Sequence, residues 1–339
     1  MKLGLSLDYW VGGPPPGQED LITTAEELGL DSVWTSEAYG SDAISPLAWL
    51  GSRTARPRLG TAIMQMSART PTATAMVAMT MDHLSGGRFI LGLGASGPQV
   101  VEGWYGQEFA KPLARTREYI QIVRQVTTRQ LVEFTGDHFE VPARASGLGK
   151  PLKSTLHPIR PEMPIFLAAE GPKNVALAAE VADGWLPLFY SPFDDSGYRA
   201  ALAEGFARPG ARHGLDDFEI ACQVTVDIDE DLDGAMGRVR QGLAMYIGGM
   251  GAKEENFHSN VFVRMGYEGV CADVAELFLN GSKAEAAARI PASLVEKVAL
   301  VGPKAKVAEE LSIWKDSLLT TMLISGSPAT LRVMADLLR

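Results

Sequence analysis

Residues 90–97 read Ile-Leu-Gly-Leu-Gly-Ala-Ser-Gly, and this stretch decides the fold because its glycines suit two different architectures. A G-x-G-x-x-G pattern at the end of an apolar run is typical of a dinucleotide-binding βαβ unit. A doubly wound sheet usually carries that pattern in its first strand-turn-helix unit. Here three strand-like runs precede it, and Glu118, the acid about 20 residues further on, falls inside a predicted helix over 112–127. The dinucleotide-binding context is therefore incomplete.

Strand-like and helix-like segments alternate along the whole chain. Such alternation predicts a parallel sheet with right-handed crossovers, and eight units of this kind match a (β/α)8 TIM barrel with insertions. A doubly wound sheet is the alternative, but it needs a switch point and usually a domain boundary, and no linker-like segment marks one. We expect the eight strands to begin near residues 3, 33, 59, 89, 165, 186, 221 and 321.

We expect a single domain over residues 1–339, interrupted by two insertions. Residues 130–163 contain a predicted hairpin, turning at 135–137, and then a loop rich in Gly, Pro and Lys. Residues 250–300 are predicted to be an irregular insertion of short helices. Between the two insertions, 219–227 is predicted as one strand.

Charge and composition exclude several classes of function. The net charge of −10 without a basic cluster argues against nucleic acid and anionic membranes as partners. Cys222 and Cys271 form no C-x-x-C motif, and the five histidines are scattered, so neither a disulfide framework nor a metal site is expected. No run of 18 apolar residues and no signal-like N-terminus occurs, which predicts a soluble cytoplasmic protein that acts on a small molecule.

In a barrel, the residues that directly follow the strands form the rim of the active site. This predicted rim is apolar and aromatic, with no Ser-His-Asp set, which favours an organic cofactor that carries the chemistry itself. Asp8 and Glu37 are the two acids expected to point into the mouth, where a carboxyl group shielded from water can donate or accept a proton. The alternative for either acid is a salt bridge to a rim arginine or a helix cap.

Residues 168–173, Ala-Ala-Glu-Gly-Pro-Lys, end one predicted strand and open the next helix. The N–H groups at a helix N-terminus attract phosphate, Gly171 permits close approach, and Lys173 adds positive charge. A plain strand-to-helix turn is the alternative. By contrast, residues 82–88 connect a helix to a strand on the opposite rim, so His83 is expected to be structural.

Several motifs, in this order, resemble one known family. They are Leu-Gly-Leu-Ser-Leu at 3–7, residues 28–37 and 58–63, Asp-His-Leu-Ser-Gly-Gly-Arg at 82–88 running into 91–94, residues 168–172, and Ala-Asp-Gly-Trp at 182–185. The ordered set resembles the bacterial-luciferase-like superfamily of (β/α)8 flavoproteins, in its branch that uses the deazaflavin coenzyme F420. Residues 94–104 look like the actinobacterial members of that branch.

The resemblance implies a set of site residues. It implies a non-prolyl cis peptide at Ala62–Ile63 behind the deazaflavin ring, with Glu37 near the ring. The cofactor-binding residues implied are Ala62, Ile63, Met64, Ser96, Gly97, Glu170, Gly171, Pro172, Lys173, Leu188 and Arg264. The catalytic acids expected are Glu37 and Asp8, and the substrate side is expected near Trp10, Tyr39 and Trp104.

The function implied is hydride transfer between C5 of the deazaflavin and an organic substrate, in the direction of reduction. Ala38 stands where the sugar-6-phosphate dehydrogenases of this branch carry a histidine, and Gly97 where they carry a glutamate, which counts against sugar-phosphate oxidation. An FMN-dependent monooxygenase and a non-catalytic flavin-binding barrel remain alternatives. Members of the family usually pair through the second and third helices, so a homodimer or higher homo-oligomer is expected, and the small residues of 73–81 would permit close packing.

Overall fold

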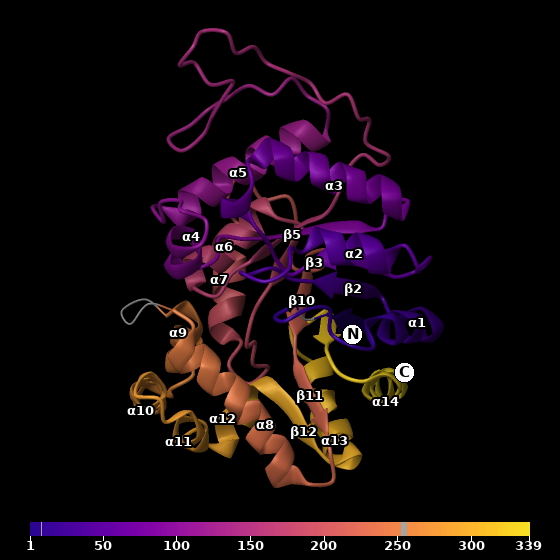
Figure 1. Cartoon of the computed structure of the whole chain (residues 1–339), viewed down its shortest axis with the longest axis vertical. Coiled ribbons are helices and arrows are strands. Elements are labelled where there is room, and N and C mark those ends of the chain that lie inside the picture. The colour runs from indigo at the N-terminus through magenta and orange to yellow at the C-terminus, as the bar shows by residue number, and fades with distance from the viewer. Residues whose placement is uncertain (8, 252–255) are drawn as a thin grey trace.

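The computed structural model describes residues 1–7, 9–251 and 256–339, and the strands at its centre close into a parallel barrel (Figure 1). The order around the barrel is β3 (Arg58–Thr61), β2 (Ser32–Thr35), β1 (Lys2–Ser6), β13 (Thr321–Ile324), β10 (Glu219–Gln223), β9 (Gly184–Leu186), β8 (Ile165–Ala168), β5 (Phe89–Gly94) and β4 (Met64–Gln65). β3 also pairs with β5, which closes the barrel. Because β3 and β4 are two parts of one interrupted strand, the closed sheet confirms the (β/α)8 barrel and excludes the doubly wound alternative.

Helices surround the barrel between its strands, as the alternation of segments predicts. They are α1 (Gln18–Leu28), α2 (Ile44–Gly51), α3 (Pro71–Ser85), α5 (Pro112–Thr127), α6 (Pro172–Val181), α7 (Ser196–Phe206), α13 (Lys304–Lys315) and α14 (Pro328–Leu338). Proline occupies the first turn of α3, α5, α6 and α14, where a missing N–H costs no hydrogen bond. Left-handed glycines, Gly29 and Gly86, end α1 and α3. A short helix that the sequence did not predict, α4 (Pro98–Gly103), follows β5.

The prediction of one continuous strand over 219–227 is wrong. β10 stays in the barrel, whereas β11 (Thr225–Ile228) leaves it and pairs in parallel with β12 (Ala299–Gly302). The change of direction follows Val224, whose backbone N–H makes a last bond to Leu323 O of the barrel (2.8 Å).

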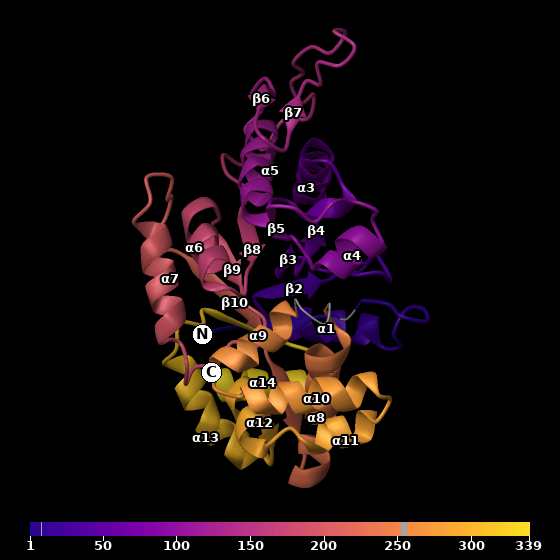
Figure 2. The ribbon, with the colours of Figure 1, turned by 90° about the vertical axis from the view of Figure 1, so that its left-hand side faces the viewer.

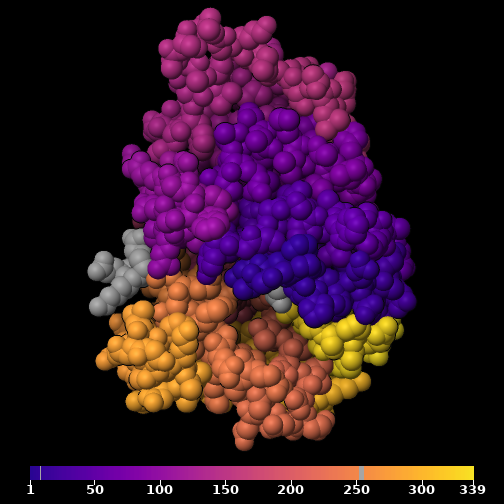
Figure 3. All heavy atoms as spheres, viewed as in Figure 1, coloured from indigo at the N-terminus to yellow at the C-terminus, as the bar shows by residue number. Residues whose placement is uncertain are grey.

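The described part of the segment over 250–300 consists mostly of short helices, as the sequence predicts. Its elements pack with α8 (Leu232–Ala244) and a π-helical turn (Met245–Gly249) around an apolar core of their own. They are α9 (Phe257–Arg264), α10 (Glu268–Leu279), α11 (Lys283–Ala288) and α12 (Ala292–Val298). In Figures 2 and 3 this helical lobe forms the lower end of the molecule. Its core residues recur at helical spacing, a pattern in the sequence that indicates amphipathic helices.

The predicted hairpin is present as β6 (Phe134–Thr135) and β7 (Glu140–Val141). The chain after it extends away from the barrel and forms the upper end of the molecule in Figures 1 and 3. No helix among the described residues is long and apolar enough to cross a membrane.

A bulge interrupts the third barrel strand. Gly60 pairs with Ile90 and Met64 pairs with Leu93, so the β3–β4 strand takes four residue steps where β5 takes three. One extra residue on one strand is the definition of a β-bulge, and bulges of this kind often lie beside active sites. The bulge falls at Ala62–Ile63, and the peptide bond between these residues is cis, as the resemblance implies.

Gly92 allows β5 to pass the bulge at close range. Its N–H donates to Thr61 Oγ1 (3.0 Å), and the same hydroxyl donates to Gly92 O (2.8 Å). A Cβ on Gly92 would lie 1.7 Å from Thr61 O, which is backbone and cannot move aside. The first glycine of the G-x-G-x-x-G pattern is therefore required for barrel closure.

We predict that Gly92→Ala lowers the free energy of unfolding by about 3 kcal/mol or more, because the strands must separate to admit the methyl group. Gly237→Ala is the matched control, since a Cβ there meets no atom within 4 Å in the middle of α8. It should raise stability by about 0.5–1 kcal/mol. Urea unfolding followed by circular dichroism measures both, and equal effects of the two substitutions would contradict the packing role of Gly92.

Candidate functional site

The floor of the barrel's C-terminal end, which we call the recess, is apolar. Trp34 and Phe166 fill the barrel below it, with ring centroids 5.8 Å apart. Above them, half-buried Ala62, Ile63 and Ala168 pack on the same cluster. Gln223, the last residue of β10, is exposed between buried neighbours at this end of the barrel.

The bulge forms one wall of the recess and is held by its backbone. Ala62 N–H donates to Thr35 O (2.7 Å), and Ile63 O accepts from Glu37 N–H (3.2 Å). The side chains of Ala62 and Ile63 are half-buried, whereas Met64 is fully buried in the core between the barrel and its helices. The role of Met64 in cofactor binding stays a prediction, and its side chain points away from the half-buried surface of Ala62 and Ile63.

Glu37 lies beside the bulge with both carboxylate oxygens engaged. Oε1 accepts from Gln65 N–H (2.7 Å), and Oε2 accepts from Ala43 N–H (3.0 Å) at the start of α2. The guanidinium group of Arg69 bonds both oxygens, at 2.6 and 3.1 Å. Only 3% of the Glu37 side chain is exposed. The arrangement is the salt bridge and helix cap that the sequence left as the alternative, and Arg69 is a site residue that the sequence analysis did not identify.

Asp8, the second expected acid, lies outside the described residues. Of the aromatic residues expected on the substrate side, Tyr39 and Trp104 lie together, with ring centroids 6.5 Å apart. Both rings are more than half exposed. Trp10 is half-buried, its backbone N–H donates to Ser41 Oγ (3.0 Å), and its indole Nε1 is buried without a partner. The loops after β1 and β2 and after α4 thus bring aromatic rings to one side of the mouth.

The end of β5 forms the next part of the rim. A Cβ on Gly94 would lie 2.8 Å from the Ile63 side chain, whereas a Cβ on Gly97 would meet nothing within 4 Å. Ser96, between them, has φ +61°, a left-handed conformation that non-glycine residues seldom adopt and that is frequent at binding sites. Gly94 therefore allows the close packing of β5 against the bulge, and Gly97, which follows Ser96, borders open space at the rim.

The end of β8 leads into an uncapped helix. Gly171 is the N-cap of α6, no side chain caps the helix, and Pro172 occupies the first turn. A Cβ on Gly171 would meet nothing within 4 Å. Lys173 is exposed, and Arg264 of α9 reaches this turn by donating to Glu170 O (2.8 Å). Arg264 therefore reaches the turn that holds Glu170, Gly171 and Lys173, and two cations lie at a helix start that no side chain caps.

The Glu170 side chain turns away from this helix terminus toward the helical lobe. Its Oε1 lies 2.6 Å from His258 Nδ1, and its Oε2 is buried without a partner. His258, which sequence analysis did not identify, packs edge-on against Tyr246 and Phe189. Phe189 follows half-buried Leu188 and has φ +55°. The helical lobe thus supplies part of the rim on the β8–β9 side.

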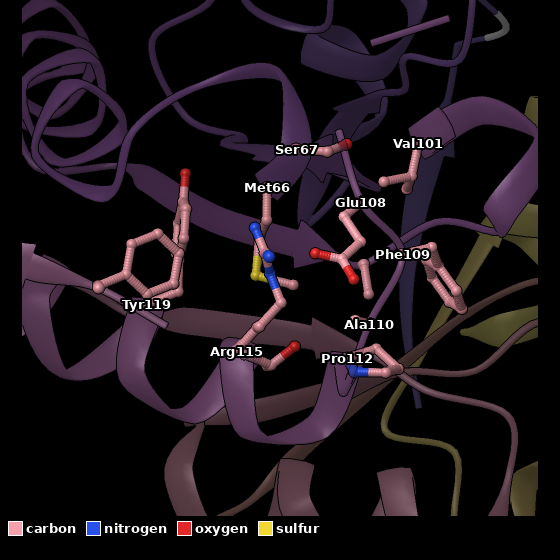
Figure 4. Close-up of a pocket in the computed structure, with 12 residues that line it drawn as sticks. Met66, Ser67, Val101, Glu108, Phe109, Ala110, Pro112, Arg115 and Tyr119 are labelled. Atoms are coloured by element: carbon pink, nitrogen blue, oxygen red, sulfur yellow. The ribbon is translucent and has the colours of Figure 1, made fainter. Parts of the chain in front are cut away.

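A small pocket, partly open to solvent, lies beside the mouth behind the ends of β4 and β5 (Figure 4). Its inner wall consists of Met66, Ser67 and Ala95, which directly follow the strands that carry the bulge and Gly94. Arg115 and Glu108 are its charged lining residues.

We predict that Glu37→Gln lowers the free energy of unfolding by about 2–4 kcal/mol, because the substitution leaves Arg69 without a counter-charge in a partly buried site. Glu19→Gln is the control, since it removes an exposed ion pair with Arg53 and should change stability by less than about 1 kcal/mol. Urea unfolding at neutral pH compares the two. A loss at Glu37 no greater than that at Glu19 would contradict a bracing role.

Comparisons with known proteins agree with this architecture. Residues 7–321 match the family model described as luciferase-like monooxygenase. The chain is 54% identical over 342 residues, 99% of each chain, to a Mycobacterium tuberculosis protein provisionally named a coenzyme F420-dependent oxidoreductase. It is 31% identical over 232 residues to the 5,10-methylenetetrahydromethanopterin reductase of Archaeoglobus fulgidus, covering 68% of this chain and 66% of that protein.

A solved structure shares the fold over nearly the whole chain. The coenzyme F420-dependent tetrahydromethanopterin reductase of Methanopyrus kandleri superposes with a TM-score of 0.82 at 21% identity, covering 98% of this chain and 97% of that one. Together with the match over 7–321, these similarities show that the chain belongs to the luciferase-like monooxygenase family.

Proposed function

We propose that this chain is a coenzyme F420-dependent oxidoreductase that transfers a hydride between C5 of the deazaflavin and an organic substrate, acting as a reductase. The observation that carries the proposal is the pairing of two features on one rim. These are an apolar recess walled by the braced bulge at Ala62–Ile63, and the uncapped N-terminus of α6 with Arg264 beside it. The names of the relatives support F420 as the cofactor.

The residues present fit a flat ring with an anionic tail. Ala62 and Ile63 offer a half-buried apolar surface for the ring, and Ser96 and Gly97 border it. The first-turn N–H groups of α6, with Lys173 and Arg264, suit a phosphate, since a helix N-terminus and cations both favour negative charge. When bound there, the deazaflavin supplies the hydride. The protein positions it and limits the access of water.

The proton and the substrate are assigned to different residues. Because both oxygens of Glu37 are engaged by Arg69 and by backbone N–H groups, we assign Glu37 the role of positioning the bulge. The proton-transfer role that the sequence offers to two acids then falls to Asp8. Tyr39 and Trp104 supply apolar rings that shield the substrate side of the recess.

The proposal is tested by titrating the purified protein with F420 and with FMN, each followed by its own fluorescence. We expect F420 to bind at micromolar concentration or below and FMN to bind at least about 100-fold more weakly, a difference of roughly 2.7 kcal/mol. Tight FMN binding without F420 binding would favour an FMN-dependent monooxygenase. Binding of neither flavin would favour a barrel that uses no flavin.

The phosphate site has its own test. Arg264→Met should weaken F420 about 10-fold or more, because a charged hydrogen bond to phosphate is worth about 1.5–3 kcal/mol. Arg289→Met, which removes an exposed arginine of the helical lobe, is the matched control and should leave F420 affinity unchanged. Equal affinity in both variants would contradict the placement of the phosphate at α6.

A further inference from the structure

The pocket behind β4 and β5 contains a cation without a counter-ion. Arg115, in the first turn of α5, is half-buried, and its guanidinium group forms no hydrogen bond or ion pair with any residue that the structure describes. The guanidinium carbon lies 5.7 Å from the Phe139 ring centroid. A guanidinium group carries five N–H donors in a planar fork, so a partly enclosed arginine with none of them paired favours an anionic ligand.

The rest of the pocket is mainly apolar and adjoins the recess. Met66, Val101, Phe109 and Pro112 line it, and Ser67 contributes a hydroxyl group that is buried without a partner. Ala95 lies in its wall one residue before Ser96, so the pocket and the proposed ring site share one backbone segment. The pocket and the proposed ring site are therefore neighbours at this segment.

Glu108 sets the balance of charge in the pocket. In Figure 4 its side chain and that of Arg115 extend into the pocket from different sides, and no ion pair joins them among the described residues. Glu108 is exposed, whereas Arg115 is half-buried. Water screens the charge of Glu108 more than that of Arg115. An anion beside Arg115 is therefore attracted by Arg115 more strongly than it is repelled by Glu108.

We infer that this pocket is the substrate subsite and that it selects a flat, apolar molecule bearing one carboxylate, which Arg115 binds. The inference rests on the proposed function for its link to hydride transfer, but the binding of the carboxylate does not depend on it. The planar fork of arginine matches a carboxylate through two parallel bonds, and the apolar wall favours an aromatic or unsaturated body. An unsaturated acid also carries the activated double bond that a reductase requires.

The test compares cinnamate with its uncharged analogue cinnamamide, titrated into the full-length protein with and without saturating oxidised F420. Wild-type protein should bind cinnamate at millimolar concentration or below and at least 10-fold more tightly than cinnamamide. Arg115→Gln should lower the affinity for cinnamate at least 10-fold and change the affinity for cinnamamide less than 3-fold. Glu108→Gln should raise the affinity for cinnamate about 2-fold to 3-fold, because it removes the repulsion between the two carboxylates.

Arg144→Gln is the control, because Arg144 carries the same charge on the exposed arm after β7. It should leave both affinities unchanged. Unfolding curves for Arg115→Gln establish that the variant is folded. If that variant alone proves unstable, Arg115→Lys, which keeps the charge without the planar fork, should weaken cinnamate by a smaller factor.

Three results would overturn the inference. They are no cinnamate binding to wild-type protein at 10 mM, cinnamate affinity unchanged within 2-fold in Arg115→Gln, and a loss of F420 affinity in Arg115→Gln as large as the loss of cinnamate affinity. The last result would assign the pocket to the cofactor. Failure of F420 to bind at all, with the cinnamate pattern intact, would refute the proposed function and leave the carboxylate subsite standing.

Discussion

The close contact between Thr61 and Gly92 is the constraint on which the site depends. At this point the barrel strand β3 ends in the bulge. The extra residue interrupts the regular pairing with β5, which resumes at β4. The Thr61 hydroxyl bonds both the N–H and the carbonyl of Gly92, which replaces part of the missing ladder. Because Gly92 has no Cβ, the strands stay close enough for the barrel to close around a bulge that faces the mouth.

The bulge is then fixed from its other side by Glu37. Its N–H holds Ile63 O, and its carboxylate holds Gln65 N–H and Arg69. A buried carboxylate that is paired and fully hydrogen-bonded is rigid, and a rigid wall is what a cofactor site needs in order to hold a reacting atom in place. In the proposed function, this one acidic residue connects barrel closure to the chemistry by positioning the bulge.

The sequence predicted the eight barrel strands, most surrounding helices and the position of the cis peptide, because period, proline and glycine signals are local and the motif order is specific. It did not predict the partners of its own candidate residues. Arg69 is 32 positions from Glu37, and His258 is 88 positions from Glu170. Ion pairs of this kind arise only when folding brings segments that are distant in the sequence together at one rim. The prediction of one strand over 219–227 failed for a similar reason. An apolar run does not reveal which sheet each half of it joins.

The central claim is that the recess at the bulge holds a deazaflavin whose phosphate lies at the start of α6. A crystal structure of the protein with F420 tests it most directly. The account predicts the ring in van der Waals contact with Ala62 and Ile63, and the phosphate within hydrogen-bond distance of the first turn of α6 and of Arg264. A ring bound away from the bulge, or a phosphate bound on another part of the rim, would contradict it.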